Sequence, residues 1–154
     1  MSVLATNLTP ILANDATVIA NCANRVLPFD IRTAGPDAYG PGALIPVVSE
    51  NGFQLCTICV DDQGGVPPPF APLGAEQDRI VVWIFDEWSA TGRARIDLLA
   101  ARVKVLLHLY QEPSSKAIVR WTGRLGIQPD PLPDTGALDQ VTFSAVRLPS
   151  GIRS

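Results

Sequence analysis

The chain has 154 residues, 47% apolar and 18% charged, so the sequence predicts a single folded domain, residues 1–154, large enough to bury a core. The net charge of −3 excludes an overall basic surface of the kind that binds nucleic acid. The N-terminus lacks a basic segment followed by an apolar run, and no stretch approaches the roughly 20 apolar residues of a membrane span. We therefore expect a cytoplasmic chain with three free thiols.

Acidic and basic residues are unevenly distributed. Residues 26–90 carry nine acidic and two basic side chains, a net charge of −7, whereas residues 91–125 carry seven basic and two acidic side chains, a net charge of +5. In a self-assembling protein this segregation is one way to place opposite charges across each subunit contact. An ordinary solvated surface is an equally good interpretation.

The first segment has helical features. Thr9 and Pro10 suit the N-cap and first position of a helix, and Asp15 suits the cap of a second helical segment, 16–23. Residues 28–52 are rich in Pro and Gly, and a loop of this length is unusual inside a compact domain. We expect either a mobile loop or an arm that packs on a neighbouring molecule, and we favour the arm.

Two strands are predicted next, Gln54–Val60 and Arg79–Trp88. The second is apolar on both faces, so we expect a central strand that is covered on both sides. Residues 61–77 are predicted to form a projecting loop, in which two glycines give flexibility and three prolines give stiffness. We expect this loop to contact a neighbouring molecule, and a solvent-exposed excursion of no consequence is the alternative. Its candidate contact residues are Asp61, Asp62, Gly64, Gly65, Pro67, Pro68, Pro69 and Phe70.

The strongest helical signal covers Thr91–Tyr110, with Thr91 as the predicted cap. One apolar stripe along it is expected to pack on the sheet. Leu98, Val105 and Leu109 add a second apolar row, which predicts that the helix also contacts a neighbouring subunit.

Two further strands, Lys116–Leu125 and Leu138–Leu148, flank a Pro/Gly/Asp-rich connector, residues 126–137. The predicted order is therefore α-β-β-α-β-β. Sequential hairpins on either side of a helix predict an α/β (α+β) domain with a mostly antiparallel four-stranded sheet and helices packed on one face.

No catalytic, metal-binding or cofactor-binding motif emerges. Cys56 and Cys59 match C-x-x-C, but on a strand they point to opposite faces, so we expect them to be unbridged and metal-free. Cys22 is expected in a helix without a disulfide. The single histidine, His108, is placed to interact with the last carbonyls of a helix. Asp86-Glu87 is interpreted as a solvated strand end.

Two stretches resemble the tail-terminator (tail-completion) proteins of long-tailed, siphovirus-type bacteriophages. The opening helix runs into Asn24-Arg25-Val26-Leu27-Pro28, like the arginine-hydrophobic-proline exit in those proteins. Arg79-Ile-Val-Val-Trp-Ile-Phe-Asp86, followed by Glu87-Trp88-Ser89-Ala90-Thr91 and the long helix, is similar to their strand, tryptophan-containing exit and helix. The final strand resembles the one that closes their domain. This chain departs from the compact members in residues 28–52 and in the prolines at 67–69.

The resemblance implies a structural virion protein and no enzyme. Such a subunit forms a ring, most often a hexamer, on the last ring of the major tail tube protein. The ring stops tube polymerisation, presents a surface to the head–tail connector or stopper protein, and lets DNA pass without specific binding. Location at the head-proximal end of the tail, after assembly in the bacterial cytoplasm, follows from this role.

Three other functions remain open on the sequence. A head-completion or stopper protein of the neck shares the context but usually has a different fold. A small enzyme would need a pocket with convergent polar side chains. An intracellular adaptor protein unrelated to phage would be monomeric in solution.

Overall fold

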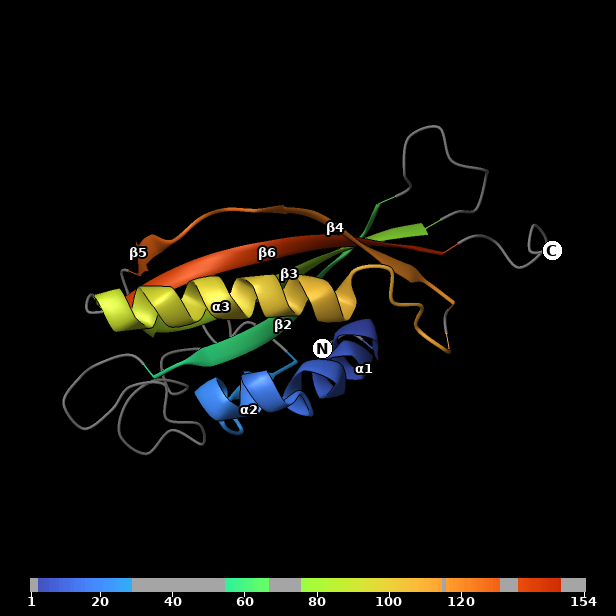
Figure 1. The fold of residues 1–154 in the computed structure, drawn as a ribbon. Helices are drawn as coiled ribbons and strands as arrows, with labels where there is room; N and C mark the ends of the chain where they lie inside the picture. Colours follow the sequence, from blue (N-terminus) through green and yellow to red (C-terminus); the bar gives the residue numbers. More distant parts are fainter. Residues whose placement is uncertain (1–2, 29–54, 67–75, 115, 131–135, 148–154) are drawn as a thin grey trace, which may run out of the picture.

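A computed structural model describes residues 3–28, 55–66, 76–114, 116–130 and 136–147 (Figure 1). The elements follow one another as α1 (Val3–Ala13), α2 (Ala16–Cys22), β1 (Val26–Leu27), β2 (Thr57–Val66), β3 (Glu76–Glu87), α3 (Ala90–Leu107), β4 (Ile118–Arg124), β5 (Gln128–Asp130) and β6 (Gly136–Arg147). Helix α3 runs along the sheet, α1 packs against β2, and both α1 and α2 pack against α3 (Figure 1).

The strands form one six-stranded sheet in the order β1-β2-β3-β6-β4, and β5 also pairs with β6. Among the strands in the described residues, only β1 and β2 pair in parallel. The predicted α+β class and mostly antiparallel sheet are confirmed. The predicted number of four strands and the predicted element order are wrong. Strands β1 and β5 were missed, since they have only two and three residues, too few to produce a periodic pattern.

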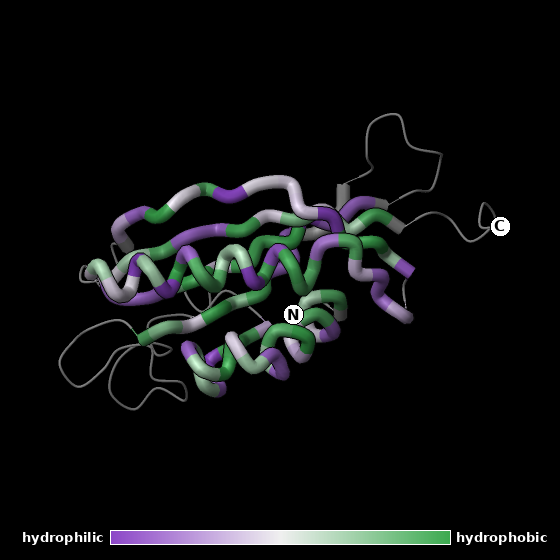
Figure 2. Tube along the Cα trace, in the orientation of Figure 1, coloured by the Kyte–Doolittle hydropathy of each residue, from purple (hydrophilic) through white to green (hydrophobic). Residues whose placement is uncertain are grey.

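The core lies between the sheet and the helices. On the central strand β3, Ile80, Val82 and Ile84 face the helices and are fully buried. The alternate residues Val81 and Phe85 are also buried, as predicted for a strand covered on both sides. Figure 2 shows hydrophobic colour on α1 and on the visible part of β2, two elements that pack against each other. The helices contribute Leu4, Leu8, Leu12, Val18, Ile96, Leu99, Val103 and Leu107 to this core.

The hairpin of β2 and β3 extends into the segment predicted to be a loop. Asp61, Asp62, Gly64 and Gly65 belong to β2, and a β-bulge between Asp62 and Gly65 accommodates the glycine pair while pairing with β3 continues. The prediction that these residues lie in a projecting loop is therefore wrong. Pro67, Pro68, Pro69 and Phe70 lie outside the described residues, as does the predicted arm apart from Pro28.

The helix ends differ in part from those predicted. Helix α1 begins at Val3 and contains Pro10. Thr9 is therefore inside α1, where its hydroxyl donates a hydrogen bond to the carbonyl of Ala5. Asp15 caps α2 as predicted, with its carboxylate accepting a hydrogen bond from the Val18 amide.

Helix α3 is capped by Ser89 instead of Thr91. The hydroxyl oxygen of Ser89 accepts a hydrogen bond of 3.0 Å from the amide of Gly92. The hydroxyl of Ser89 also donates to a carboxylate oxygen of Glu87 at 3.0 Å. This hydroxyl therefore both caps the helix and joins it to the end of β3.

Candidate functional site

An apolar row lies on the outer side of α3. Leu98 and Val105 have exposed fractions of 51% and 68%, and Ala94 and Ala101 are also exposed. We name these four residues the outer row. Their spacing of four, three and four residues places them along one line of the helix. Leu109 is 58% exposed but lies beyond the helix end, with a positive φ of 66°, so it does not continue the row.

The charged side chains of α3 are bound to partners within the same chain. Each makes an ion pair or cation–π contact with a residue of another element or of the segment preceding α3. These contacts are Arg93 with Trp88, Arg95 with Asp86, Asp97 with Arg124, Arg102 with Asp15, and Lys104 with Trp121. The outer row is consequently flanked by charges that already have intramolecular partners.

This pairing changes the interpretation of the uneven charge distribution. Arg95 and Arg102, two of the basic residues counted in 91–125, bind Asp86 and Asp15 of the same subunit at 2.7 and 2.6 Å. Part of the segregated charge therefore neutralises itself between α3 and the rest of the domain. These two arginines are therefore not free to pair with acidic side chains of a second subunit.

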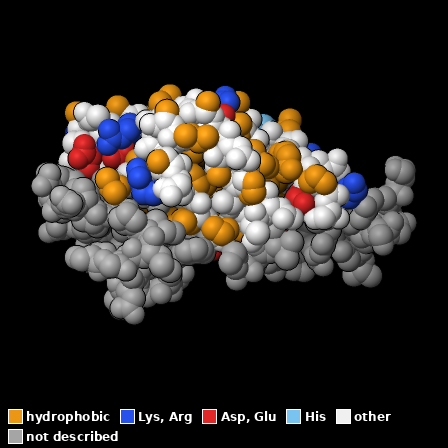
Figure 3. Space-filling model, turned by 90° about the horizontal axis from the view of Figure 1, so that it is seen from below, with side chains coloured by type: hydrophobic (Ala, Val, Ile, Leu, Met, Phe, Trp, Pro, Cys, Tyr) orange, Lys and Arg blue, Asp and Glu red, His pale blue; other side chains and the backbone are white. Residues whose placement is uncertain are grey.

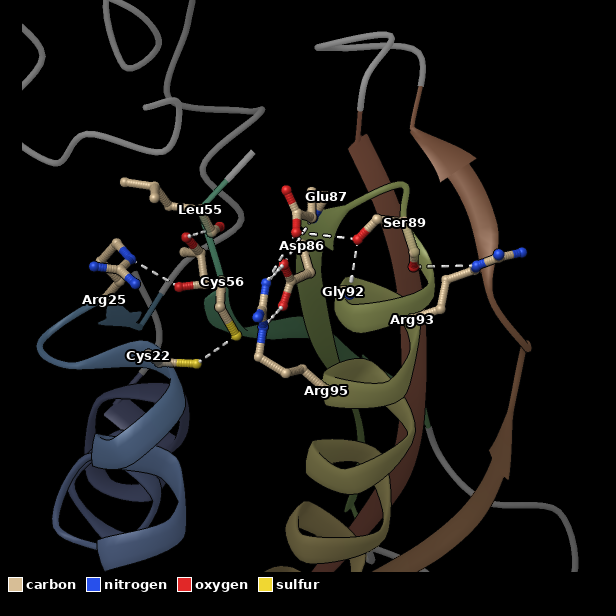
Figure 4. A network of polar contacts seen from close by, with 11 residues as sticks. Cys22, Arg25, Leu55, Cys56, Asp86, Glu87, Ser89, Gly92, Arg93 and Arg95 are labelled. Atoms are coloured by element: carbon tan, nitrogen blue, oxygen red, sulfur yellow. Dashed lines mark hydrogen bonds and ion pairs between the residues drawn. The ribbon is translucent and has the colours of Figure 1, made fainter. Parts of the chain in front are cut away.

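Asp86 is at the centre of a buried polar network at the end of β3 (Figure 4). Its side chain is fully buried and accepts two hydrogen bonds of 2.7 Å from the guanidinium of Arg95. The amide of Glu87 adds a third at 2.7 Å. The hydrogen bond to Asp86 is the main cause of a raised pKa of Arg95.

The prediction that Asp86 is part of a solvated strand end is therefore wrong. Asp86 is two residues beyond Ile84 and lies on the same, helix-covered face of β3. The alternation of apolar residues along β3 therefore indicates that Asp86 faces the helices. We interpreted it as exposed because charged residues at strand ends usually are.

A second buried carboxylate, Asp139 on β6, lies opposite Ile84 of β3 in the sheet. It accepts hydrogen bonds from the guanidinium of Arg124 and from the amide of Gly126, the latter at 3.0 Å. Arg124 also binds Asp97 of α3. The network therefore connects β6, β4 and α3 through one arginine, and sequence reasoning did not identify it.

The cysteines occupy different surroundings. Cys56 belongs to the helix-side core, whereas Cys59 pairs in the sheet with Trp83 of β3. Cys22 is in α2, as predicted, and its Sγ lies 3.1 Å from the Sγ of Cys56. All three cysteines were predicted to be unbridged, and sequence reasoning did not identify the contact of Cys22 with Cys56.

His108 has a more specific role than predicted. It is the C-cap residue of α3, and its ring Nδ1 accepts a hydrogen bond of 3.0 Å from the backbone amide of Trp121 in β4. The expected interaction of the ring with the last helical carbonyls is replaced by this contact between α3 and β4.

Within the described ranges, no group of three or more His, Cys, Asp or Glu side chains is placed to hold a metal ion. No helix in the described part of the chain is long and apolar enough to cross a membrane. No protein-family profile and no curated protein matches the sequence.

A space-filling view from the side of α1 and α2 shows how the surface side chains are distributed (Figure 3). Hydrophobic side chains are dispersed over this side, and acidic and basic side chains gather at the end where α3 begins. The apolar contact surface on α3 is the outer row, while the charged groups of that helix bind residues of the same subunit.

Proposed function

We propose that this chain is a structural virion protein that forms a ring on the head-proximal end of a long-tailed phage tail. The ring caps the tail tube, stops its polymerisation and joins the tail to the head-side connector. Its sequence basis is the resemblance in residues 24–28 and 79–110. In this role the protein has no catalytic activity and no cofactor, and it belongs to the virion.

The observation that carries the proposal is the exposed outer row of α3. Ring subunits need a surface that binds a neighbouring copy, and a heterologous contact closes into a ring when its rotation divides the circle. Leu98 and Val105 supply apolar area at the centre of a helix face, where burial of a leucine or valine contributes about 1.5–3 kcal/mol. Because the flanking charges have internal partners, covering the row does not leave an unpaired charge of α3 in the contact.

The charge distribution is compatible with a channel that lets DNA pass. The chain has a net charge of −3, and the guanidinium groups of Arg95, Arg102 and Arg124 are bound to carboxylates of the same subunit. These three guanidinium groups are therefore not free cations that could hold the phosphates of passing DNA.

Native mass spectrometry of the purified chain, alone and mixed with the tail tube protein of the same phage, tests the proposal. We expect a cyclic oligomer of six copies, at least when tube protein is present. Leu98→Glu and Val105→Glu should each prevent it, because a charge would be buried in the contact.

Leu125→Glu is the matched control, because Leu125 is 55% exposed and lies outside the outer row. It should assemble like the unaltered chain. A chain that stays monomeric on assembled tails, or that assembles equally well with Glu at position 98 or 105, contradicts the proposal. A persistent monomer with no affinity for tail proteins would favour an adaptor, and binding at the capsid vertex would favour a neck protein.

A further inference from the structure

Two cysteines that are far apart in the sequence are in contact. The Sγ atoms of Cys22, the last residue of α2, and Cys56, which directly precedes β2, are 3.1 Å apart (Figure 4). A disulfide bond has an S–S distance of about 2.05 Å, so a movement of about 1 Å brings the two sulfur atoms to bonding distance. Both side chains are buried in the helix-side core, which limits the alternative positions open to them.

We propose that Cys22 and Cys56 are a disulfide-forming site, oxidised when the protein meets a peroxide, and that the bond fastens α2 to the start of β2. This inference does not depend on the proposed assembly role. In the first step one thiolate attacks a peroxide oxygen, giving a sulfenic acid and releasing hydroxide, which takes up a proton to become water. The second thiol then attacks the sulfenic sulfur and displaces the oxygen as a second water. Two thiols and one hydrogen peroxide thus give one disulfide and two waters, with two electrons passing from sulfur to peroxide.

The surroundings of Cys22 and Cys56 determine the rate at which the two thiols are oxidised. The hydrogen bond with Cys22 and burial both raise the pKa of the Cys56 thiol, and the thiolate is the reactive form. We therefore expect oxidation on a scale of minutes to hours, through brief openings of the short helix α2. The backbone beside the pair is held on one side, because the Arg25 side chain donates a 2.7 Å hydrogen bond to the carbonyl of Cys56.

The bond would restrict the unfolded chain. It closes a loop between residues separated by 34 positions, and loops of this size reduce the entropy of the unfolded state substantially. We expect the oxidised protein to have a Tm higher by about 10 °C than the reduced protein.

The experiment treats the full chain with hydrogen peroxide and maps disulfide-linked peptides by mass spectrometry after free thiols are blocked. We expect a Cys22–Cys56 link and an unmodified Cys59. The same link should form in Cys59→Ala, the matched control for a buried cysteine outside the pair. Cys22→Ala and Cys56→Ala should lack any link and show no rise in Tm after treatment.

Peptide mapping of the unaltered chain decides the question even where an alanine variant fails to fold. Sulfinic or sulfonic acids on separate cysteines, a Cys56–Cys59 link, or links between chains would each overturn the proposal. A Cys22–Cys56 link that leaves Tm unchanged would overturn the claim that the bond fastens α2.

Discussion

At the scale of single residues, the carboxylates of the helix-side layer are the main polar feature of the molecule. Asp86 and Asp139 are fully buried, and each is bound to an arginine that is about one third exposed. A buried charge without a partner is very unfavourable, whereas a paired and fully hydrogen-bonded one is tolerated. These two carboxylates therefore constrain how β3 and α3, and how β6 and β4, fit together, since separating either pair would leave a buried charge without its partner.

Asp86→Asn should destabilise the protein by about 2–3 kcal/mol, because it leaves the Arg95 guanidinium with an amide group in place of a carboxylate. The control is Asp97→Asn, which removes a carboxylate that also binds an arginine but is 61% exposed. It should cost less than about 1 kcal/mol. Urea unfolding monitored by tryptophan fluorescence measures both changes, and equal losses would refute the distinction.

Acid should weaken the contact of α2 with α3. The hydrogen bond from Arg102 is the main cause of a lowered pKa of Asp15, so the folded protein holds this proton less tightly than the unfolded chain. The resulting stability is present above the unfolded pKa of about 4 and is lost as the pH falls through the lower folded pKa.

Asp15→Asn isolates this effect, because asparagine is an equally good N-cap. The variant should be less stable than the unaltered chain at pH 7, with a difference that shrinks below about pH 4. Urea unfolding at a series of pH values checks it. A difference that is constant across the acidic range would show that the ion pair with Arg102 is not responsible.

At the scale of elements, the start of α3 depends on a close approach to the end of β3. A Cβ at Gly92 would overlap the carbonyl oxygen of Glu87. Alanine normally favours a helix over glycine by about 1 kcal/mol, yet Gly92→Ala should destabilise this protein by about 1–3 kcal/mol because of the clash.

Gly123→Ala in β4 is the control, since a Cβ there meets nothing within 4 Å. Its effect should stay within about 0.5 kcal/mol. Thermal unfolding of both variants measures the two changes in stability. A Gly92→Ala variant that is more stable than the unaltered chain would contradict the close approach.

The long elements were predictable because their periodicity extends over many residues. Strand β3 and helix α3 were identified with ends shifted by one to three residues. Strand β2 was misjudged beyond Val60, because a Gly-Gly pair inside a bulged strand has the composition of a turn. The contact of Cys22 with Cys56 could not be predicted, since it depends on how α2 packs against the sheet.

Of the three candidate contact residues on the long helix, two lie on its exposed face and the third lies beyond its end. The second apolar row on the helix follows from 3.6-residue periodicity, and Leu98 and Val105 are indeed exposed. Leu109 fits the same periodicity, but the helix ends at Leu107, and helix ends are poorly defined by apolar patterns.

At the scale of the whole molecule, the connection between β2 and β3 remains the predicted contact with a neighbouring ring. Because β2 continues to Val66, a deletion of Pro67–Pro72 leaves the strand at its full length. Leu73–Glu76 then joins the paired residues Val66 and Gln77. The domain should stay folded, whereas phage carrying the deletion should make tails of uncontrolled length or tails without heads.

Circular dichroism of the deleted protein and electron microscopy of the particles measure these two outcomes. Phe70→Ala is the milder variant and should weaken the same function, because it removes the largest apolar side chain of the segment. Tails of normal length that are joined to heads in the deletion would rule out the contact role.

The position of β6 in the sheet has a consequence for synthesis. This strand pairs with β3, β4 and β5, yet it follows all of them in the chain. At about 5–20 residues per second, translation of the chain takes roughly 8–30 s, and β3 waits for its partner through the later part of that time. The described sheet is therefore completed only after β6 leaves the ribosome, and a chain truncated before β6 exposes open strand edges that favour proteolysis or aggregation.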